Sequence, residues 1–165
     1  MEPVTVTTES SAGTEALARV VSGHVVGGDV VLLAGDLGAG KTVFARGLAH
    51  GLGVEEPVAS PTFTLAREYR GRVRVVHADI YRLDHVRELA DLGFDDTDDD
   101  TVAIVEWGDV VSGAFGVDRL EVRLEFVPGR DDARCITIGA TGPDWTTRVA
   151  ALSAAVVQAE PEAGA

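Results

Sequence analysis

The sequence predicts an α/β fold in which helices flank a central mixed β-sheet. Two observations lead to this prediction: segments with apolar residues at helical spacing alternate with aliphatic runs typical of buried strands, and at least one β-hairpin adds an antiparallel pair. The chain has 165 residues, a length at which a single core is common. We therefore expect one domain over residues 1–157, followed by a flexible C-terminal tail over 158–165.

The first predicted elements are a helix and a buried strand. Apolar side chains within residues 17–25 recur at the spacing of one helix face, and Ser11 or Thr14 can cap that helix. Gly27-Gly28 breaks the pattern. Residues 29–34 then form a continuous aliphatic run after Asp29, so we expect a central parallel strand there.

The second half predicts more strands. Alternating residues at 62–69 and 72–78 predict a hairpin with a tight turn at Arg70-Gly71, and residues 101–106 form another aliphatic run typical of a buried strand. The remaining expected elements are a short helix at 84–93, outer strands at 120–126 and 135–138, and a weak helix at 144–157.

The segment Gly35–Thr42 carries the first chemical signal. It fits the pattern G-x-x-x-x-G-K-[ST], it follows a predicted buried strand, and it opens a predicted helix over residues 43–52. Glycines let backbone N–H groups turn toward a phosphate, and the helix N-terminus adds a positive dipole. Lys41, the only lysine in the chain, is expected to reach the β- and γ-phosphates, and the Thr42 hydroxyl to bind Mg²⁺. The alternative is a glycine-rich turn with no ligand. The residues expected to line the nucleotide site are Gly35, Asp36, Leu37, Gly38, Ala39, Gly40, Lys41, Thr42 and Val43.

Two acids at predicted strand ends are candidates for the chemistry of hydrolysis. Asp79 ends one alternating strand, and Glu106 ends the aliphatic run at 101–106. In such folds a carboxylate at a neighbouring strand end serves the metal, and a second can orient the attacking water. Each acid can instead simply face solvent or pair with an arginine. ATP is the expected nucleotide, because the chain has no second lysine to build the Asn/Thr-Lys-x-Asp motif of guanine-specific GTPases.

The charge balance limits the range of partners. The chain has 14 Lys and Arg residues and 27 Asp and Glu residues, which gives a net charge of −13. We therefore expect the chain alone to repel nucleic acids. The longest aliphatic stretch, residues 30–34, is far shorter than the roughly 20 residues of a membrane span, and we expect a cytoplasmic protein with no membrane contact. Cys135 is the only cysteine and is expected to serve packing.

Five motifs in order resemble one family. They are Gly35–Thr42, Ser60-Pro-Thr-Phe-Thr-Leu65, His77-Ala-Asp-Ile-Tyr-Arg-Leu83, Glu88-Leu-Ala-Asp-Leu-Gly93 and Val105-Glu-Trp107. Their order and spacing resemble those of the bacterial TsaE (YjeE) family. The resemblance implies a P-loop NTPase fold and a small Mg-dependent ATPase. It also implies a role in the N6-threonylcarbamoyl modification of adenosine in tRNAs that read ANN codons.

The resemblance further implies partners and roles for single residues. Members of the family act with a complex of TsaB and TsaD, the latter being the transferase, so tRNA would be met only through the partners. Asp79 and Glu106 would be the catalytic or metal-linked acids, and Ser60 and Thr62 would belong to a switch-like loop that senses phosphate or metal. Trp107 would lie near the nucleotide, although it can equally be an aromatic residue at the edge of the core.

Several alternatives remain open at this stage. A small-molecule kinase would use the same loop, with Arg82 and Arg87 near the transferred phosphate, and a nucleotide-gated binding module would hydrolyse ATP only incidentally. His77 can position a phosphate or simply pack in the core, and the acidic run 95–100 reads as a solvated loop. The arginines of the predicted hairpin form either a solvated face or a strip that binds a partner: Arg67, Arg70, Arg72 and Arg74.

Overall fold

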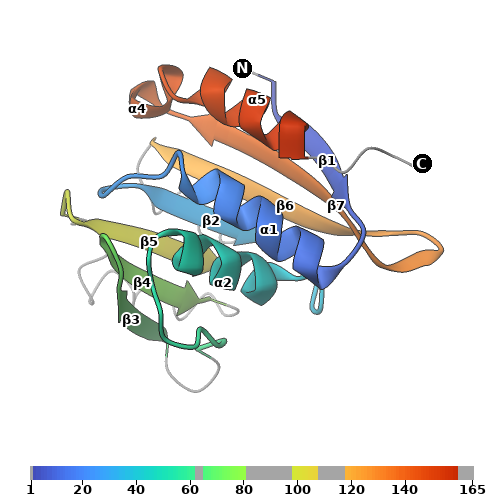
Figure 1. The fold of residues 1–165 in the computed structure, drawn as a ribbon, viewed down its shortest axis with the longest axis horizontal. Helices are drawn as coiled ribbons and strands as arrows, with labels where there is room; N and C mark the ends of the chain where they lie inside the picture. Colours follow the sequence, from blue (N-terminus) through green and yellow to red (C-terminus); the bar gives the residue numbers. More distant parts are fainter. Residues whose placement is uncertain (1, 62–64, 81–97, 108–117, 160–165) are drawn as a thin grey trace.

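The computed structural model describes residues 2–61, 65–80, 98–107 and 118–159. At its centre lies a sheet of seven strands in the order β1-β7-β6-β2-β5-β4-β3 (Figure 1). The strands are β1 (Val4–Thr8), β2 (Val30–Ala34), β3 (Ala66–Arg70), β4 (Arg74–Asp79), β5 (Thr101–Glu106), β6 (Arg119–Val127) and β7 (Arg130–Thr141).

The middle of the sheet is parallel and its edges are antiparallel. Strand β2 pairs in parallel with both β5 and β6, and β4 pairs in parallel with β5. Strands β3, β7 and β1 each join by an antiparallel ladder. All five residues of β2 and all six of β5 are buried, as a central parallel strand covered on both faces requires. The predicted mixed sheet with a central parallel strand at 29–34 is confirmed.

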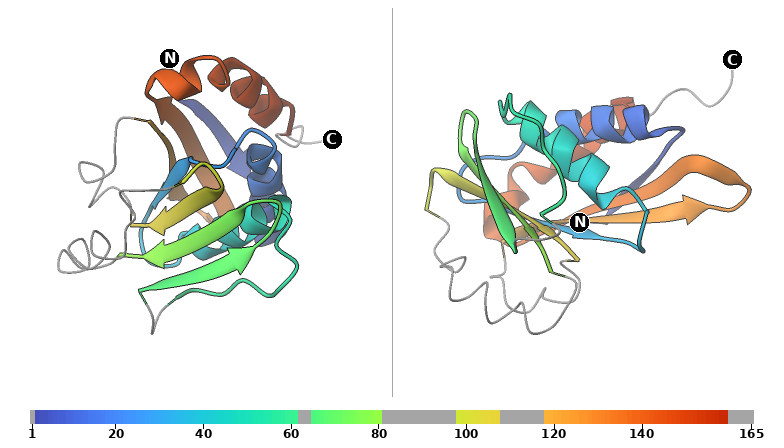
Figure 2. Two further views of the ribbon diagram at one scale, coloured as in Figure 1. Left: turned by 90° about the vertical axis from the view of Figure 1, so that its left-hand side faces the viewer. Right: turned by 90° about the horizontal axis from the view of Figure 1, so that it is seen from below.

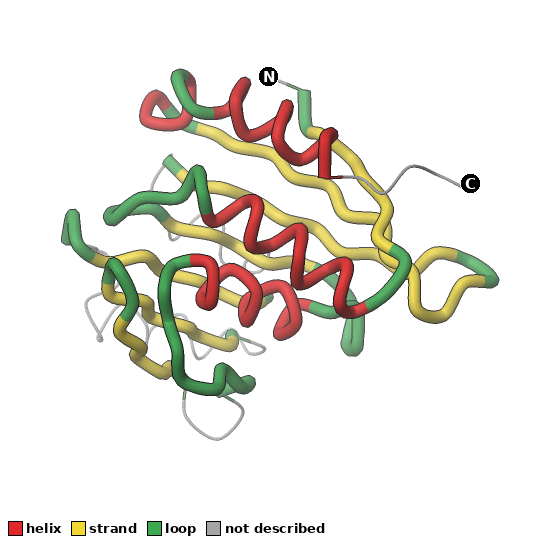
Figure 3. Tube along the Cα trace, in the orientation of Figure 1, coloured by secondary structure: helices red, strands yellow, loops and turns green. Residues whose placement is uncertain are grey.

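The helices α1 (Ser11–Ser22), α2 (Lys41–Gly51) and α5 (Val149–Ala159) lie on one side of the sheet, and a short helix α4 (Pro143–Thr146) precedes α5 (Figures 2 and 3). Their apolar faces form the main core with the sheet residues beneath them. A second, smaller cluster lies on the other face of the central strands. Among the described residues, no helix is long and apolar enough to cross a membrane.

The start of α1 differs from the prediction by one residue. The cap is Ser10, whose Oγ accepts a hydrogen bond of 3.1 Å from the Gly13 N–H, and not Ser11 or Thr14. Ser10 is extended, at φ −157° and ψ 168°, which is the backbone that an N-cap needs, whereas Ser11 is already helical. Thr14 is buried and bonds the Thr8 hydroxyl at 2.7 Å.

The predicted hairpin exists, but its turn lies further along the chain. Strands β3 and β4 pair from Arg70 opposite Arg74, so residues 71–73 form the turn, closed by a hydrogen bond of 3.0 Å from the Gly71 N–H to the Val73 carbonyl. Arg67, Arg70, Arg72 and Arg74 are all exposed, as the interpretation of a solvated face expects, but Arg72 also makes specific contacts. Its guanidinium donates to the carbonyls of Ser22 and Gly51, the last residues of α1 and α2, and to that of Val25 beyond α1, at 2.9–3.0 Å.

The C-terminal part forms longer elements than the pattern predicts. The two outer strands extend to Arg119–Val127 and Arg130–Thr141 and pair as one antiparallel hairpin. The predicted weak helix is divided into α4 and α5, and α5 includes Gln158 and Ala159, which the sequence pattern assigns to the tail. The predicted helix at 84–93 and the remainder of the tail, 160–165, lie outside the described residues.

Candidate nucleotide site

A glycine-rich loop joins the C-terminal end of β2 to the first turn of α2. Gly35, Gly38 and Gly40 have φ values of 150°, 80° and 104°, in the region that side chains disfavour. A Cβ on Gly35 would also lie 2.5 Å from the Leu124 carbonyl oxygen of β6. Two of the motif's fixed glycines, Gly35 and Gly40, therefore adopt a backbone that glycine alone adopts readily.

The rest of the loop is built around one buried residue. Ala39 is fully buried, and its N–H donates to the Asp36 carbonyl at 3.0 Å, which closes a turn. Leu37, at the tip, is 87% exposed. Gly40 caps α2, and its carbonyl accepts the first helical bond from the Phe44 N–H at 2.9 Å. Val43 lies half-buried in the first turn of that helix.

Lys41 directs its ammonium back into the loop. Its Nζ donates to the carbonyls of Gly35 at 2.6 Å and Asp36 at 3.0 Å. The same nitrogen lies 3.7 Å from the centre of the Trp107 ring, a cation–π distance. The whole residue is only 5% exposed. The positive charge of Lys41 therefore lies where the loop would enclose an anion.

Thr42, Glu106 and His77 form a buried hydrogen-bonded set. The Thr42 hydroxyl donates to Glu106 Oε1 at 2.9 Å, and His77 Nε2 lies 2.8 Å from the same oxygen. Glu106 is 3% exposed and His77 is fully buried. Two of the residues expected to bind the metal, Thr42 and Glu106, are thus in direct contact although 64 positions separate them in the chain.

His77 contacts Glu106 through one of its two ring nitrogens. With Glu106 ionised, Nε2 must donate the hydrogen bond, and Nδ1 of a neutral ring is then an acceptor. Nδ1 has no hydrogen-bond partner among the described residues. His77 is therefore a core residue, as one of the two interpretations expects, and it also holds the Glu106 carboxylate, which neither interpretation included.

Asp79 lies directly beside Glu106 in the parallel pairing of β4 and β5. Its Oδ2 accepts a long hydrogen bond of 3.5 Å from the Ser60 hydroxyl, and Oδ1 is buried with no partner among the described residues. Burial, and next the negative charge of Glu106, raise the pKa of Asp79, while His77 and Lys41 oppose the shift. The structure therefore places both predicted acids at the carboxyl ends of β4 and β5, the same end of the sheet as the loop after β2.

Trp107 follows Glu106 with an unusual backbone. Its φ of 64° makes it the one non-glycine residue with positive φ in the described parts of the chain. Bulky residues rarely adopt this conformation, which typically costs about 1–3 kcal/mol. Here it places the indole ring over the Lys41 ammonium, so the strain lies at the candidate site. The position fits the interpretation of Trp107 as a residue close to the nucleotide.

Sequence reasoning missed Arg134. This residue lies on β7, and its Nε donates to the Ala39 carbonyl at 2.9 Å while Nη2 donates to the Gly38 carbonyl at 3.3 Å. No local motif marks it, and the strand predicted at 135–138 begins one residue later. Only the register of β7 against β6 brings it to the loop.

Comparison with known proteins identifies the family. The model of the family described as "Threonylcarbamoyl adenosine biosynthesis protein TsaE" matches residues 8–135. The chain belongs to the TsaE family. A protein of Streptomyces coelicolor named tRNA threonylcarbamoyladenosine biosynthesis protein TsaE is 39% identical over 137 residues, which cover 79% of this chain and 93% of that protein. Proteins of the same name from Mycobacterium bovis and Bacillus subtilis are 42% and 40% identical, over 74% and 78% of this chain and 84% and 80% of theirs.

A solved structure of a relative agrees with the fold. The crystal structure of Bacillus subtilis YdiB superposes with a TM-score of 0.75 and 32% identity, covering 93% of this chain and 95% of that one. The predicted P-loop NTPase fold, with a central mixed sheet flanked by helices, is confirmed. The TsaE family takes part in tRNA threonylcarbamoyladenosine biosynthesis, so this chain is assigned to that process.

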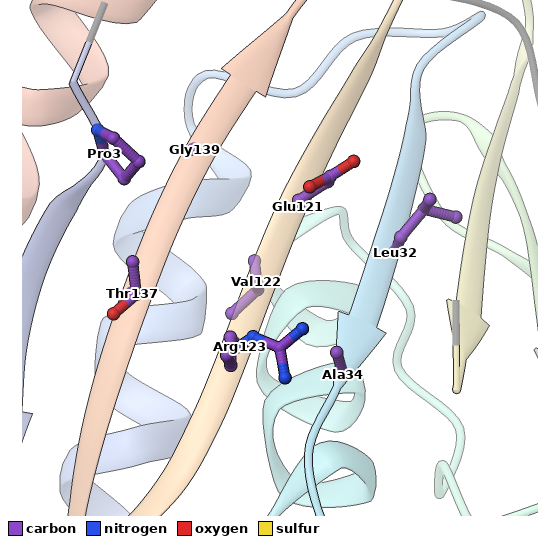
Figure 4. Close-up of a pocket in the computed structure, with 8 residues that line it drawn as sticks. All are labelled: Pro3, Leu32, Ala34, Glu121, Val122, Arg123, Thr137 and Gly139. Atoms are coloured by element: carbon purple, nitrogen blue, oxygen red, sulfur yellow. The ribbon is translucent and has the colours of Figure 1, made fainter. Parts of the chain in front are cut away.

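In this TsaE-family chain, one hollow borders the start of the phosphate loop and another lies on the sheet at β2, the strand that precedes it. One of about 250 Å³ lies between Gly35-Asp36 and residues 123–126 of β6. A second, of about 370 Å³, lies where side chains of β2, β6 and β7 meet, and Figure 4 shows Arg123 reaching toward Ala34 at the end of β2. Thr62, Arg82 and Arg87 of the initial predictions lie outside the described residues.

Proposed function

We propose that this chain is a Mg-dependent ATPase that serves tRNA threonylcarbamoyladenosine biosynthesis together with TsaB and TsaD. The observation that carries the proposal is the Thr42 hydroxyl bonded at 2.9 Å to Glu106 at the base of a glycine loop that encloses the Lys41 ammonium. A helix-start hydroxyl beside a strand-end carboxylate is the pairing that P-loop enzymes use for Mg²⁺. The TsaE family supplies the process in which this chemistry acts.

The loop and Lys41 would bind the phosphates of ATP. The backbone N–H groups of residues 35–42 supply donors, and the Lys41 ammonium would exchange the Gly35 and Asp36 carbonyls for phosphate oxygens. That exchange is favourable because a bond between two charged groups is stronger than one from an ammonium to a neutral carbonyl. Trp107 would keep the ammonium in place during the exchange.

Thr42 and Glu106 would hold the metal. Both offer oxygen atoms, the ligands that Mg²⁺ prefers, and they are already in contact. When bound, Mg²⁺ neutralises charge that develops on the phosphates. The hydrogen bond from His77 fixes the orientation of the Glu106 carboxylate.

Asp79 would act on the attacking water. It has a buried oxygen without a partner among the described residues, and its raised pKa makes it a stronger base than an ordinary carboxylate. Ser60, at 3.5 Å from Asp79, lies where a switch-like loop would connect to this acid. The two acids would then divide the work: Glu106 serves the metal and Asp79 the water.

The proposed partners and location are supported by the family and by the charge of the chain. A net charge of −13 makes direct tRNA binding unfavourable, so TsaB and TsaD would hold the tRNA, and the complex would work in the cytoplasm. A small-molecule kinase and a nucleotide-gated binding module remain as alternatives. The arginines that the kinase would use, Arg82 and Arg87, lie outside the described residues, so the structure favours neither alternative.

The deciding experiment measures ATP hydrolysis with Mg²⁺ by the purified chain, alone and with TsaB and TsaD. We expect phosphate release to water and a rate that changes when the partners are added. Phosphate transferred to an added metabolite would identify a kinase. Turnover that the partners leave unchanged, with nucleotide-dependent association, would identify the gated module.

Two substitutions separate binding from chemistry. Lys41→Ala should weaken ATP binding by about 10- to 100-fold, because a hydrogen bond to a charged group is worth roughly 1.5–3 kcal/mol. Asp79→Asn keeps an oxygen that can accept from Ser60, so it should bind ATP yet hydrolyse it about 10²- to 10⁴-fold more slowly. Arg130→Ala, at the exposed hairpin tip, is the matched loss of one positive charge and should change neither. Hydrolysis at the normal rate by both site variants would refute the assignment.

A further inference from the structure

The outer side of the phosphate loop is held by an arginine from a distant strand. Arg134 donates from Nε to the Ala39 carbonyl at 2.9 Å and from Nη2 to the Gly38 carbonyl at 3.3 Å. These are consecutive carbonyls of the loop, and 95 positions separate Arg134 from Ala39 in the chain. One planar guanidinium therefore contacts two successive peptide groups of the nucleotide loop.

The guanidinium itself is fixed on its other sides. Nη1 donates to the carbonyls of Asp131 and Ala133, at 2.6 and 2.7 Å, within the same strand. Phe126 lies directly opposite Arg134 in the pairing of β6 and β7, and its ring centre is 4.6 Å from the guanidinium carbon. A group held by two strand carbonyls and an aromatic face loses little further freedom when it binds the loop.

The loop lies against the same hairpin. A Cβ built on Gly38 would come within 3.8 Å of the Phe126 ring, and one on Gly40 within 3.6 Å of Leu124. The end of β6 and Arg134 of β7 thus form a platform on which the loop rests. Figure 2 shows the β6–β7 hairpin extending beyond the helices at this end of the molecule.

Because Arg134 holds the Gly38 and Ala39 carbonyls, it also determines the direction of the N–H groups in the same peptides. A trans peptide is planar, with its N–H opposite its C=O. The carbonyls of Gly38 and Ala39 belong to the same peptides as the N–H groups of Ala39 and Gly40, respectively. The Ala39 N–H closes the turn onto Asp36 at 3.0 Å, and the Gly40 N–H is directed away from Arg134. Contact with Arg134 therefore supports the turn that Ala39 closes and fixes the direction of the Gly40 N–H.

We propose that Arg134 is a positioning residue that holds the phosphate loop in its binding conformation before nucleotide arrives. The proposal rests on the proposed nucleotide site, because its benefit is a loop whose N–H groups need no rearrangement. Arg134 acts through the loop backbone and through the geometry of its fork. A lysine at this position would keep the positive charge and lose the two-carbonyl contact.

The test compares Arg134→Ala, Arg134→Lys and the control Arg130→Ala, which removes the same charge from the hairpin tip. Binding of Mg·ADP is measured by calorimetry. We expect Arg134→Ala to raise Kd about tenfold, which corresponds to about 1.4 kcal/mol. Arg134→Lys should remain within about threefold of the alanine variant, and Arg130→Ala should bind like the unmodified chain. Unchanged affinity in Arg134→Ala, or full recovery by lysine, would overturn the proposal, the latter in favour of long-range charge.

A second readout separates this proposal from the proposed function. Amide hydrogen exchange of the peptide containing residues 36–42 is measured without nucleotide. Exchange in Arg134→Ala should be at least several-fold faster than in Arg130→Ala, and equal exchange would overturn the positioning role even if nothing binds. If the unmodified chain fails to bind Mg·ADP, the proposed function fails, and the exchange result alone decides the role of Arg134. Should Arg134→Ala not fold, Phe126→Leu, which removes the aromatic face and keeps the strand, is expected to accelerate exchange in the same peptide.

Discussion

Single carboxylates in this site are distinguished by their neighbours. Glu106 receives two hydrogen bonds on one oxygen, from Thr42 and His77, whereas Asp79 is partly buried beside that negative charge with one long bond to Ser60. Both acids end parallel strands and lie at the same register position. Their separate roles therefore arise from side-chain contacts and not from their place in the fold.

The raised pKa of Asp79 predicts a pH-dependent effect on stability. Burial and the charge of Glu106 make the folded chain hold the Asp79 proton more tightly than the unfolded chain. The stability that Asp79 contributes is thus fully present below its ordinary pKa of 3.8 and is lost as pH rises through the raised value. Asp79→Asn, which stays neutral, should be more stable than the unmodified chain at pH 7.5, and this advantage should vanish near pH 3.5.

Urea denaturation at both pH values measures this difference. Asp132→Asn, an exposed acid of β7, serves as the control and should match the unmodified chain at either pH. If Asp79→Asn changes the free energy of unfolding equally at pH 7.5 and pH 3.5, ionisation of Asp79 does not destabilise the folded chain, and the prediction is wrong.

Both acids could be predicted from the sequence because each ends a recognisable strand pattern. The roles of His77 and Arg134 could not. His77 lies in an alternating strand like any inward-facing residue, and its contact with Glu106 depends on β4 lying beside β5. The position of Arg134 depends on the pairing of β6 with β7 and on the place of β6 beside β2, which no local pattern encodes.

Among the elements, helices α1 and α2 pack closely through small residues. A Cβ on Gly47 would collide with the Glu15 carbonyl oxygen and with the Ala18 side chain, and one on Gly51 would collide with Ser22. Glu15 pairs with Arg19 in its own helix at 2.8 Å, and the close approach of the helices also brings it within 3.3 Å of Arg46 in α2. The glycines of α2 are therefore contact positions between the helices.

This packing predicts that Gly47→Ala destabilises the fold. Alanine is the better helix former by about 1 kcal/mol, but overpacking against the backbone of α1 typically costs 1–3 kcal/mol, so we expect a net loss. Gly13→Ala in α1 is the matched control, since its Cβ would make only ordinary contacts at 3.5 Å and should be neutral or stabilising. Free energies of unfolding from urea titrations test the pair, and a Gly47→Ala chain as stable as Gly13→Ala would contradict the close contact.

At this scale the sequence predicted the hydrophobic strands well and the element ends less well. The runs at 30–34 and 101–106 were identifiable because a doubly covered strand has no polar positions. The edge strand β1 had no such pattern, and its identity depends on pairing with β7. The cap of α1 moved to Ser10 because adjacent serines offer equivalent side chains and only the backbone decides between them.

The molecule as a whole is strongly acidic, which predicts its behaviour toward RNA. With a net charge of −13, the isolated chain should give no shift of tRNA in native gels at physiological salt, even at tens of micromolar protein. Added TsaB and TsaD should produce a shift that this chain alone does not. Saturable tRNA binding by the chain alone would contradict the proposed arrangement, in which the partners hold the RNA.

The phosphate loop also contains the only lysine of the chain. Of the chain's 14 cationic side chains only Lys41 carries a primary amine, and that amine is the one inside the loop. Amine-acylating reagents therefore have a single side-chain target, and a phosphate bound there would shield it. The mass of one proteolytic peptide could then report site occupancy, without radioactivity, a reporter dye or an engineered label.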